Sequence, residues 1–429
     1  MRRKLLFGLS TCLPVAISLL LASPATAETR LTISGQVRVR AEGEKKSFDP
    51  SASVLQHTDL RTRIGVGAEI ESNTHLFVQM QDSRRLGGLA SSGEPASGTL
   101  ADGESVDLHQ AFVRVDRLGL AGLGFRAGRF EVDLGNQRVF GSVGWHNAGR
   151  SWEGGSLWYE TEPVRVTAHA WKRFEPGAAK RSGDFDVFGL YAELPSAGSD
   201  LFVFRERDAE KAGGSIGPGV NLLDRWDAGV YHGRAYGPVR VDVNGVYQFG
   251  DRALVAGEEA REQDISAFLA AGEIGWRIPG PRKIDLALGA DFASGDSDPA
   301  GGTYQAYDNL YYTGHKFRGF MDYFVPSRTE GLLDLLGRLS IEPCSGWTFK
   351  TDLHYFQTAQ DYSDFRGEQT RALGYELDLT LTTTRVAGVR IDGGASLFLP
   401  SESFAGADES DPGLWAYAMV TAGFGEEIR

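Results

Sequence analysis

The sequence predicts an all-β protein, a transmembrane antiparallel β-barrel of about 18 strands, and three observations support this fold class. Short stretches of alternating apolar and polar residues recur along the chain, a pattern typical of strands with two different faces. The connections between these stretches alternate between short turns and long loops, as in outer-membrane barrels. After the N-terminal apolar segment, no run of about 18 apolar residues is available for a helical membrane span.

The N-terminal segment has the features of a secretory signal peptide. Three basic residues precede an apolar run at residues 5–22, and an Ala-Thr-Ala cleavage site follows at residues 25–27. Polar residues and a proline interrupt the apolar run, which disfavours the alternative of a transmembrane helix. The expected organisation is therefore a signal peptide at residues 1–27 and a single outer-membrane β-barrel domain at residues 28–429.

Composition narrows the class of protein and of partner. The net charge of −13 argues against nucleic acid as a partner and makes any local concentration of arginine informative. Loss of the signal peptide leaves Cys344 as the single cysteine, so no intramolecular disulfide is possible. Secretion without cross-links indicates a bacterial envelope protein. Together with the predicted barrel, this places the chain in the bacterial outer membrane, in contact with lipid and lipopolysaccharide.

The alternation is clearest in the first two predicted strands, residues 31–40 and 60–70, where apolar residues occupy one face and arginines the other. The remaining strands are predicted at residues 74–83, 106–117, 122–132, 154–161, 164–174, 184–194, 200–208, 226–233, 238–250, 266–278, 283–293, 331–341, 347–359, 370–382, 388–399 and 414–424. Most are near ten residues long, which suffices to cross a bilayer at a tilt of about 45°.

The connections give the predicted barrel its orientation. Turn residues fill the short connections, for example residues 71–73, 161–163 and 279–281, which we expect on the periplasmic side. The long connections, expected on the outside, are residues 41–59, 84–105, 133–153, 209–225, 251–265, 294–330 and 400–413. A secreted β-sandwich or β-helix would not produce this alternation.

Arginines on the polar faces are the candidate functional residues, because polar faces point into the lumen of a barrel. Four arginines on the first two strands are close enough to repel one another unless carboxylates or an anionic solute lie nearby. The complete set proposed to bind anions in the lumen is Arg38, Arg40, Arg61, Arg63, Arg126, Arg129, Arg138, Arg150 and Arg390. The sequence leaves open whether these select an anion or are balanced by wall carboxylates. The candidate counter-charges are Glu69, Glu131, Asp133, Glu376, Asp378 and Asp392.

One long segment, residues 125–154, combines arginines with aromatic residues and follows the fifth predicted strand. Loops of about 20 residues are uncommon in compact domains and usually have a function. We predict that this segment folds into the mouth of the barrel, constricts the pore and contributes to anion selectivity.

Two segments resemble the alginate-export family of outer-membrane porins. The first is Gly-Arg-Phe at residues 128–130 followed by Gly-Asn-Gln-Arg at residues 135–138. The second is Ser-Gly-Asp-Ser-Asp-Pro at residues 294–299 followed by a Thr-Gly-His segment from residue 313. The resemblance implies an eighteen-stranded monomeric barrel whose arginine-lined lumen passes a linear polyuronate outward. The alternative is a general or small-anion-selective porin. Passage would be passive, with no cofactor.

Metal binding and catalysis are weaker hypotheses. Asp296 and Asp298, with Asp291 and Asp308 nearby, supply oxygen ligands suited to calcium, but their spacing is not that of an EF-hand loop. We therefore expect no metal site. His146 is the best candidate for an outer-membrane hydrolase, yet no nucleophile and base can be fixed by spacing. The expectation is a transport protein without catalytic residues.

Overall fold

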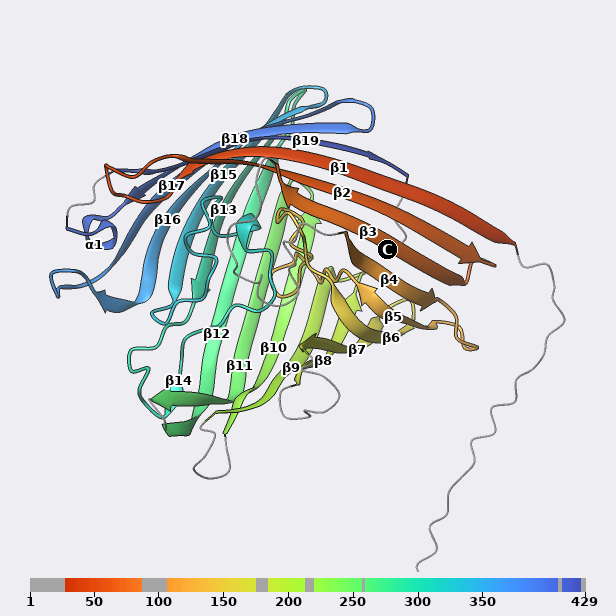
Figure 1. The fold of residues 1–429 in the computed structure, drawn as a ribbon, viewed down its shortest axis with the longest axis horizontal. Coiled ribbons are helices and arrows are strands. Elements are labelled where there is room, and N and C mark those ends of the chain that lie inside the picture. Colours follow the sequence, from red (N-terminus) through yellow and green to blue (C-terminus); the bar gives the residue numbers. More distant parts are fainter. Residues whose placement is uncertain are drawn as a thin grey trace, which may run out of the picture.

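The chain forms a closed antiparallel β-barrel with part of its loop structure folded into the interior (Figure 1). The computed structural model describes residues 28–86, 106–174, 184–212, 220–256, 259–407 and 411–425. The predicted signal peptide lies outside these ranges. Within them, no helix has both the length and the apolar character needed to cross a membrane.

Eighteen long strands are assigned among the described residues, as the alternation predicts, together with one two-residue strand. The long strands are β1 (Thr29–Lys45), β2 (Leu55–Ile70), β3 (Thr74–Arg85), β4 (Asp107–Val115), β5 (Leu123–Phe130), β6 (Trp152–Glu160), β7 (Arg165–Phe174), β8 (Phe185–Leu194), β9 (Ser199–Ala212), β10 (Val220–Tyr236), β11 (Val239–Ala256), β12 (Glu259–Ile278), β13 (Lys283–Ala293), β15 (Leu332–Cys344), β16 (Trp347–Ser363), β17 (Gln369–Val386), β18 (Val389–Pro400) and β19 (Gly413–Phe424). The short strand β14 (Thr303–Tyr304) pairs in parallel with β12.

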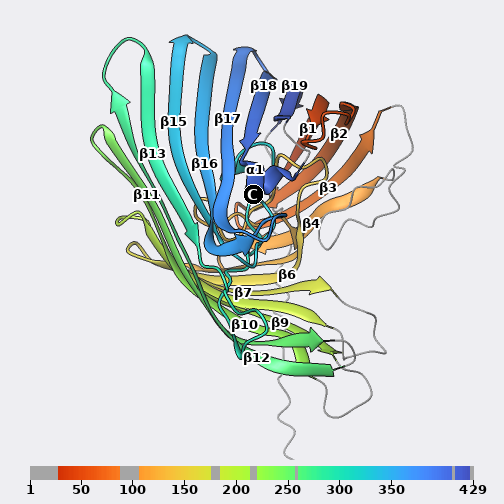
Figure 2. The same ribbon diagram turned by 90° about the vertical axis from the view of Figure 1, so that its left-hand side faces the viewer.

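The first strand closes the barrel. β1 pairs with β2 along one edge and with β19 along the other, so the sheet has no free edge there (Figure 2). Gly35 of β1 lies opposite both Ile64 and Phe424. A Cβ at Gly35 would lie 2.5 Å from the Phe424 ring, so glycine is needed for the last aromatic residue of β19 to pack against β1. Closure satisfies backbone hydrogen bonds that an open edge would leave unpaired.

The two faces of the barrel wall differ as the alternation predicts. Large apolar side chains on alternate positions are exposed on the outer surface, such as Leu31 (70% exposed) and Leu288 (69%). Positions of the opposite parity carry buried polar groups, such as Arg38 (4%) and Gln248 (0%). Because only lipid or detergent can cover an apolar belt of this kind, the wall is that of an outer-membrane barrel.

The connections alternate between short and long as predicted, but strands extend into several predicted loops. Within residues 41–59, β1 runs to Lys45 and β2 starts at Leu55, and within residues 209–225, β9 runs to Ala212 and β10 starts at Val220. A three-residue turn, residues 71–73, joins β2 and β3, and its first two residues, Glu71 and Ser72, have positive φ (49° and 52°). The predicted loop at residues 251–265 is instead largely strand, because β11 and β12 continue their ladder and pair Arg252 with Gln263. Side chains beyond the membrane need not be apolar on either face, so alternation does not reveal this extension.

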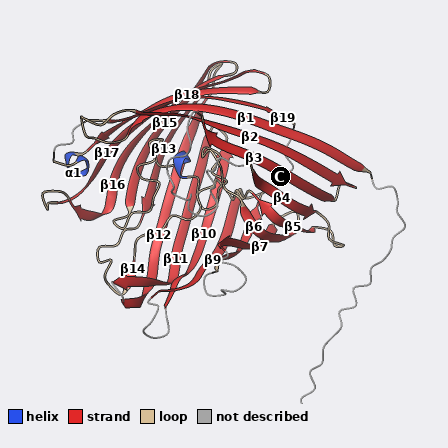
Figure 3. Cartoon of the chain, viewed as in Figure 1, coloured by secondary structure: helices blue, strands red, loops and turns tan. Residues whose placement is uncertain are grey.

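Two long connections enter the barrel interior among the described residues (tan in Figure 3). We call residues 131–151, between β5 and β6, the first inner loop, and residues 294–331, between β13 and β15, the second inner loop. The second inner loop contains β14 and the 3-10 helix η1 (Gly314–Lys316). A single turn of α-helix, α1 (Glu402–Ala405), lies between β18 and β19. The predicted inward fold of residues 125–154 therefore applies to the first inner loop.

Candidate functional site

The four arginines of β1 and β2 lie together on the interior face, as the pattern predicts. Arg38 and Arg61 are directly opposite each other in the ladder, and all four are 4–6% exposed. Their main partners are backbone carbonyls of the first inner loop. Arg38 Nη1 donates to the carbonyl of Gly144 at 2.7 Å, Arg61 Nη1 donates to the same oxygen at 3.2 Å, and Arg40 Nη1 reaches the carbonyl of Trp145 at 2.5 Å.

Carboxylates neutralise part of this arginine group. Arg40 pairs with Glu42 at 2.6 Å, and Arg63 pairs with Glu131 of the first inner loop at 3.0 Å. His109 also contacts Glu131, at 2.7 Å. Burial alone would raise the pKa of the Glu131 carboxyl, but the hydrogen bond with His109 and the charge of Arg63 outweigh it and lower that pKa to about 2. The four arginines thus fasten the first inner loop to the wall.

Arg126 and Arg129 lie on opposite faces of β5, so the prediction that both line the lumen is wrong for Arg129. Successive side chains of a strand alternate, and residues three apart cannot share a face. Arg126 stacks on Phe130 inside the barrel, with its guanidinium carbon 3.9 Å from the ring centroid. Arg129 points the other way and pairs at 2.7 Å with Glu153, whose side chain is 64% exposed.

Arg138 and Arg150 belong to the first inner loop and hold it in place. Arg138 forms an ion pair with Asp291 of β13 and stacks on Phe317, 3.9 Å from the ring centroid. Arg150 Nη1 donates to the carbonyl of Tyr311 at 2.5 Å. Burial lowers the pKa of Arg150 to about 10. Both charges are therefore committed to contacts within the protein.

Arg390 lies on the interior face near the short-turn end of β18. It pairs with Asp392 at 2.7 Å, one of the predicted counter-charges, and its side chain is 58% exposed. In this pair a wall carboxylate balances the arginine charge, which is the alternative to anion binding that the sequence left open.

The two inner loops contact each other at residues 137–141 and 311–313, within and beside the motifs that carry the family resemblance. Phe140 and Tyr311 form a parallel bridge, and the Gly141 amide donates to the Tyr311 carbonyl at 2.9 Å. The Thr313 amide donates to the Gln137 carbonyl at 3.1 Å, and the side chains of the same two residues bond at 3.0 Å. The loops therefore form one unit across the interior.

Carboxylates of β17 anchor the second inner loop. The amide of Met321 donates to Glu376 Oε1 at 2.8 Å, and the amide of Phe320 donates to Asp378 at 3.3 Å. Glu376 and Asp378 were expected to balance arginines, and they bind loop amides instead. These contacts require glycine at position 319, because Gly319 has a φ of +76° and a Cβ there would lie 2.5 Å from the Glu376 carboxylate. On the opposite wall, Arg225 Nη1 donates to Asp308 of the same loop at 2.9 Å.

A cavity of about 200 Å³ lies between the inner loops and the wall formed by β11, β12, β13, β15 and β16. Four of its basic residues were not singled out from the sequence: Arg240, Lys316, Arg338 and Lys350. Arg240 and Arg338 both pair with Glu273. Lys316 Nζ donates to the Asn136 carbonyl at 2.9 Å. Within the described part of the chain, neither lysine has a carboxylate at ion-pair distance.

Strand parity could have found the wall members of this basic group. Arg240 lies in the predicted strand 238–250 on a face shared with Asp242, Asn244 and Gln248, and Lys350 lies in the predicted strand 347–359. Face assignments for these strands would have placed both inside. Lys316 lies in a loop, where no periodicity indicates direction.

Three of the four acidic residues considered as calcium ligands, Asp291 of β13 with Asp296 and Asp308 of the second inner loop, bind other groups of the protein. Asp296 accepts the amides of Asp298 and Gln305 at 2.9 and 3.2 Å. Asp291 pairs with Arg138, and Asp308 pairs with Arg225. These contacts give three of the four carboxylates a structural role within the protein.

The residues considered for catalysis also have structural contacts. His146 Nδ1 accepts the Ala148 amide at 3.2 Å. Ser151 Oγ lies 3.4 Å from His109 Nδ1, and His109 in turn contacts Glu131. A serine, a histidine and a carboxylate are therefore linked by contacts in that order. Ser151 is only 1% exposed, so this serine offers no surface to a substrate.

Comparisons with known proteins agree with this architecture. The sequence profile of the family described as "Alginate export" matches residues 29–411. No curated protein sequence matches the chain. Among solved structures, a BenF-like porin from Pseudomonas fluorescens Pf-5 has a TM-score of 0.60 at 9% identity, with 92% of this chain and 99% of that chain covered.

Two porins from Pseudomonas aeruginosa are also similar. OccK2 (OpdF), solved in complex with glucuronate, has a TM-score of 0.60 at 12% identity, with 92% of this chain and 98% of that chain covered. OccK9 (OpdG) has a TM-score of 0.59 at 12% identity over the same shares of the two chains. At these identities the likeness shows the fold, an outer-membrane porin barrel.

Proposed function

This chain belongs to the alginate-export family, and on that premise we propose that it passes an alginate-like polyuronate, or fragments of one, across the outer membrane. Passage is passive and involves no covalent step and no cofactor. One copy of the chain forms the channel, surrounded by outer-membrane lipid and lipopolysaccharide. Its cargo is an anionic polysaccharide and not a nucleic acid.

The observation that supports an anionic cargo is a pair of lysines in the cavity between the inner loops and the wall, whose lining holds five basic and four acidic residues. Lys316 and Lys350 line it without carboxylate partners among the described residues, next to Arg240 and Arg338. A uronate carries one carboxylate per sugar ring, and lysine and arginine donate to carboxylates with charge-assisted hydrogen bonds. A few such contacts attract a polyanion, and the neighbouring Glu273 keeps each contact weak enough for release.

This proposal changes the role given to the predicted arginines. Arg38, Arg40, Arg61 and Arg63 hold the first inner loop through its carbonyls, so they shape the pore from behind the loop. Selectivity then depends on the cations left facing the cavity, and less on the first two strands.

Planar-bilayer recording tests the proposal. We expect the purified protein to conduct with anion selectivity and polymannuronate to reduce the current. Lys316→Gln with Lys350→Gln should weaken both the selectivity and the block. Arg129→Gln is the matched control, because it removes one positive charge on the outer face and should change neither. Cation selectivity without block by polymannuronate would refute the proposal.

A small-anion-selective porin is the second candidate. The cavity of about 200 Å³ and a neighbouring one of about 290 Å³ are small, and a porin of this fold was solved in complex with glucuronate, a monomeric uronate. Block by monomeric glucuronate at concentrations where polymannuronate has no effect would favour this candidate.

A hydrolase would instead release product from an ester or peptide, and loss of turnover in His146→Ala would identify it.

A further inference from the structure

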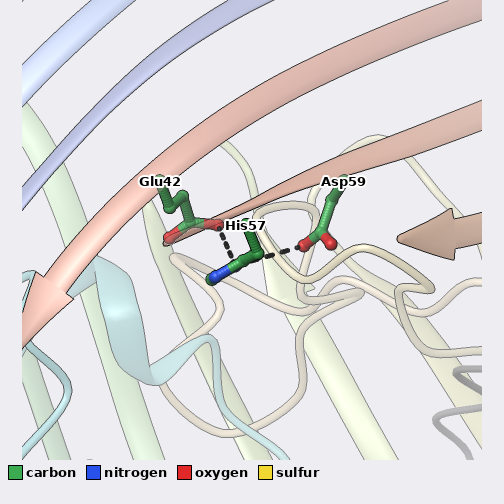
Figure 4. Close-up of side chains that lie close together, drawn as sticks. All are labelled: Glu42, His57 and Asp59. Atoms are coloured by element: carbon green, nitrogen blue, oxygen red, sulfur yellow. Dashed lines mark ion pairs between the residues drawn. The ribbon is translucent and has the colours of Figure 1, made fainter. Parts of the chain in front are cut away.

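A histidine and two carboxylates meet on the interior face of β1 and β2, near their long-loop ends. Glu42 and His57 are directly opposite each other in the ladder, and Asp59 lies two residues further along β2 on the same face (Figure 4). One ligand atom from each residue lies within 4.8 Å of the other two. We propose that Glu42, His57 and Asp59 bind a divalent transition-metal ion such as Zn²⁺.

The separations between the ligand atoms fit such an ion. His57 Nε2 lies 3.4 Å from Glu42 Oε1 and 3.7 Å from Asp59 Oδ2. A tetrahedral ion bound at about 2.0–2.2 Å from each ligand separates its ligand atoms by roughly 3.3–3.6 Å. The two separations from His57 therefore need shifts of at most a few tenths of an ångström, and the two carboxylate oxygens lie within 4.8 Å of each other. Three protein ligands leave a fourth position open to water or to a solute oxygen.

The ligand set distinguishes between metal ions. An imidazole nitrogen with two carboxylate oxygens suits Zn²⁺, Co²⁺ or Cu²⁺, whereas Ca²⁺ and Mg²⁺ prefer oxygen ligands alone. The side chains of Glu42, His57 and Asp59 are 9%, 15% and 10% exposed, so a bound ion would be largely shielded from bulk solvent and still reachable.

Neighbouring donors hold the carboxylates in place. Trp415 Nε1 donates to Glu42 Oε2 at 3.0 Å, which leaves Oε1 directed at His57. Arg85 Nε donates to Asp59 Oδ1 at 3.3 Å, which leaves Oδ2 directed at His57. Contacts of this kind orient metal ligands.

Arg40 is the competing partner. Its Nε donates to Glu42 Oε1 at 2.6 Å, and its Nη2 lies 3.6 Å from Asp59 Oδ2, so it approaches the same two oxygens as the ion would. Each oxygen has a second lone pair, which allows both contacts. Arg40 also donates to the Trp145 carbonyl and stacks on the Trp145 ring at 4.3 Å, so it has partners to retain while the ion binds.

Metal titration of the tag-free full barrel tests the site and does not depend on the proposed function. We expect one Zn²⁺ per chain by isothermal titration, and a roughly tenfold or greater loss of affinity in His57→Asn and in Asp59→Asn. His75→Asn is the matched control. His75 pairs with Asp116 at 2.9 Å, but no third ligand of this kind joins that pair in the described structure, and the variant should bind zinc normally.

Spectroscopy of the unaltered protein supports or overturns the site even if a variant fails to fold. Co²⁺ should give the visible absorption of a four-coordinate nitrogen and oxygen site, and X-ray absorption of the zinc form should show about one nitrogen and two carboxylate ligands near 2.0–2.2 Å. Equal zinc binding by the wild type and His57→Asn would overturn the proposal. So would absence of zinc binding, which would leave the three residues as an ion-pair network with Arg40.

Discussion

Replacing Gly319 with alanine should release the second inner loop from the wall. Gly319 has a φ of +76°, which costs an alanine about 1 kcal/mol or more, and the new Cβ would lie 2.5 Å from Glu376 Oε1. Either the loop or the buried Glu376 carboxylate must move, and both movements break the 2.8 Å bond from the Met321 amide. The adjacent bond from Phe320 to Asp378 would follow. An ordinary intramolecular hydrogen bond contributes about 0.5–1.5 kcal/mol, so loss of the two bonds weakens the anchoring of the second inner loop by about 1–3 kcal/mol.

Single-channel recording measures the result of this change. We expect Gly319→Ala to increase the open-channel conductance or its fluctuations, because the second inner loop no longer fills the lumen. Gly367→Ala is the control, since Gly367 has a φ of +80° with no atom within 4 Å of an added Cβ, and so carries the backbone strain without the collision. Identical conductance in the wild type and both variants would refute the inference that Gly319 allows β17 to anchor the second inner loop.

Two further predictions concern the first inner loop. The pKa of Glu131 is lowered from an ordinary 4.5 to about 2, so its contribution to stability is fully present above pH 4.5 and is lost as the pH falls through 2. Conductance and protease resistance of the loop should therefore persist from pH 7 to pH 4.5 and change between pH 4.5 and 2, and Glu131→Gln should remove that pH dependence. Arg150→Met should uncouple the two inner loops, because it deletes the 2.5 Å bond to the Tyr311 carbonyl, and should raise hydrogen exchange at the Gly141 amide. Unchanged exchange at Gly141 would show that the other contacts between the loops suffice.

The barrel could be predicted from the sequence because membrane insertion imposes a strong pattern. Each strand must present apolar residues to lipid at every second position, and each hairpin must reverse within a few turn residues, so strands and turns are both marked in the sequence. The limits of this signal appear at residues 251–265, where β11 and β12 extend past the membrane and the apolar face is no longer required.

The site could be predicted only where a residue's direction follows from parity. Arg38, Arg40, Arg61 and Arg63 were placed correctly because each lies in a clear alternating strand. The prediction for Arg129 is wrong because it rests on the charge of the residue alone. Arg129 lies three residues from Arg126 on the same strand, so the two side chains point to opposite faces. The partners of the arginines could not be predicted, since loop carbonyls have no signature in the sequence.

The loop contacts explain how a wall so rich in like charges remains folded. Four buried arginines on adjacent strands would repel one another, and the carboxylates paired with them, Glu42, Asp59 and Glu131, are too few to neutralise all four. Carbonyl oxygens of residues 144–148 supply further acceptors, so the first inner loop offers the cluster uncharged partners in addition to Glu131. The loop in turn meets the second inner loop at Gln137 and Thr313. The arginines therefore help to fix the position of both loops, and that position leaves Lys316 and Lys350 beside the cavity to which the proposed function assigns the anionic cargo.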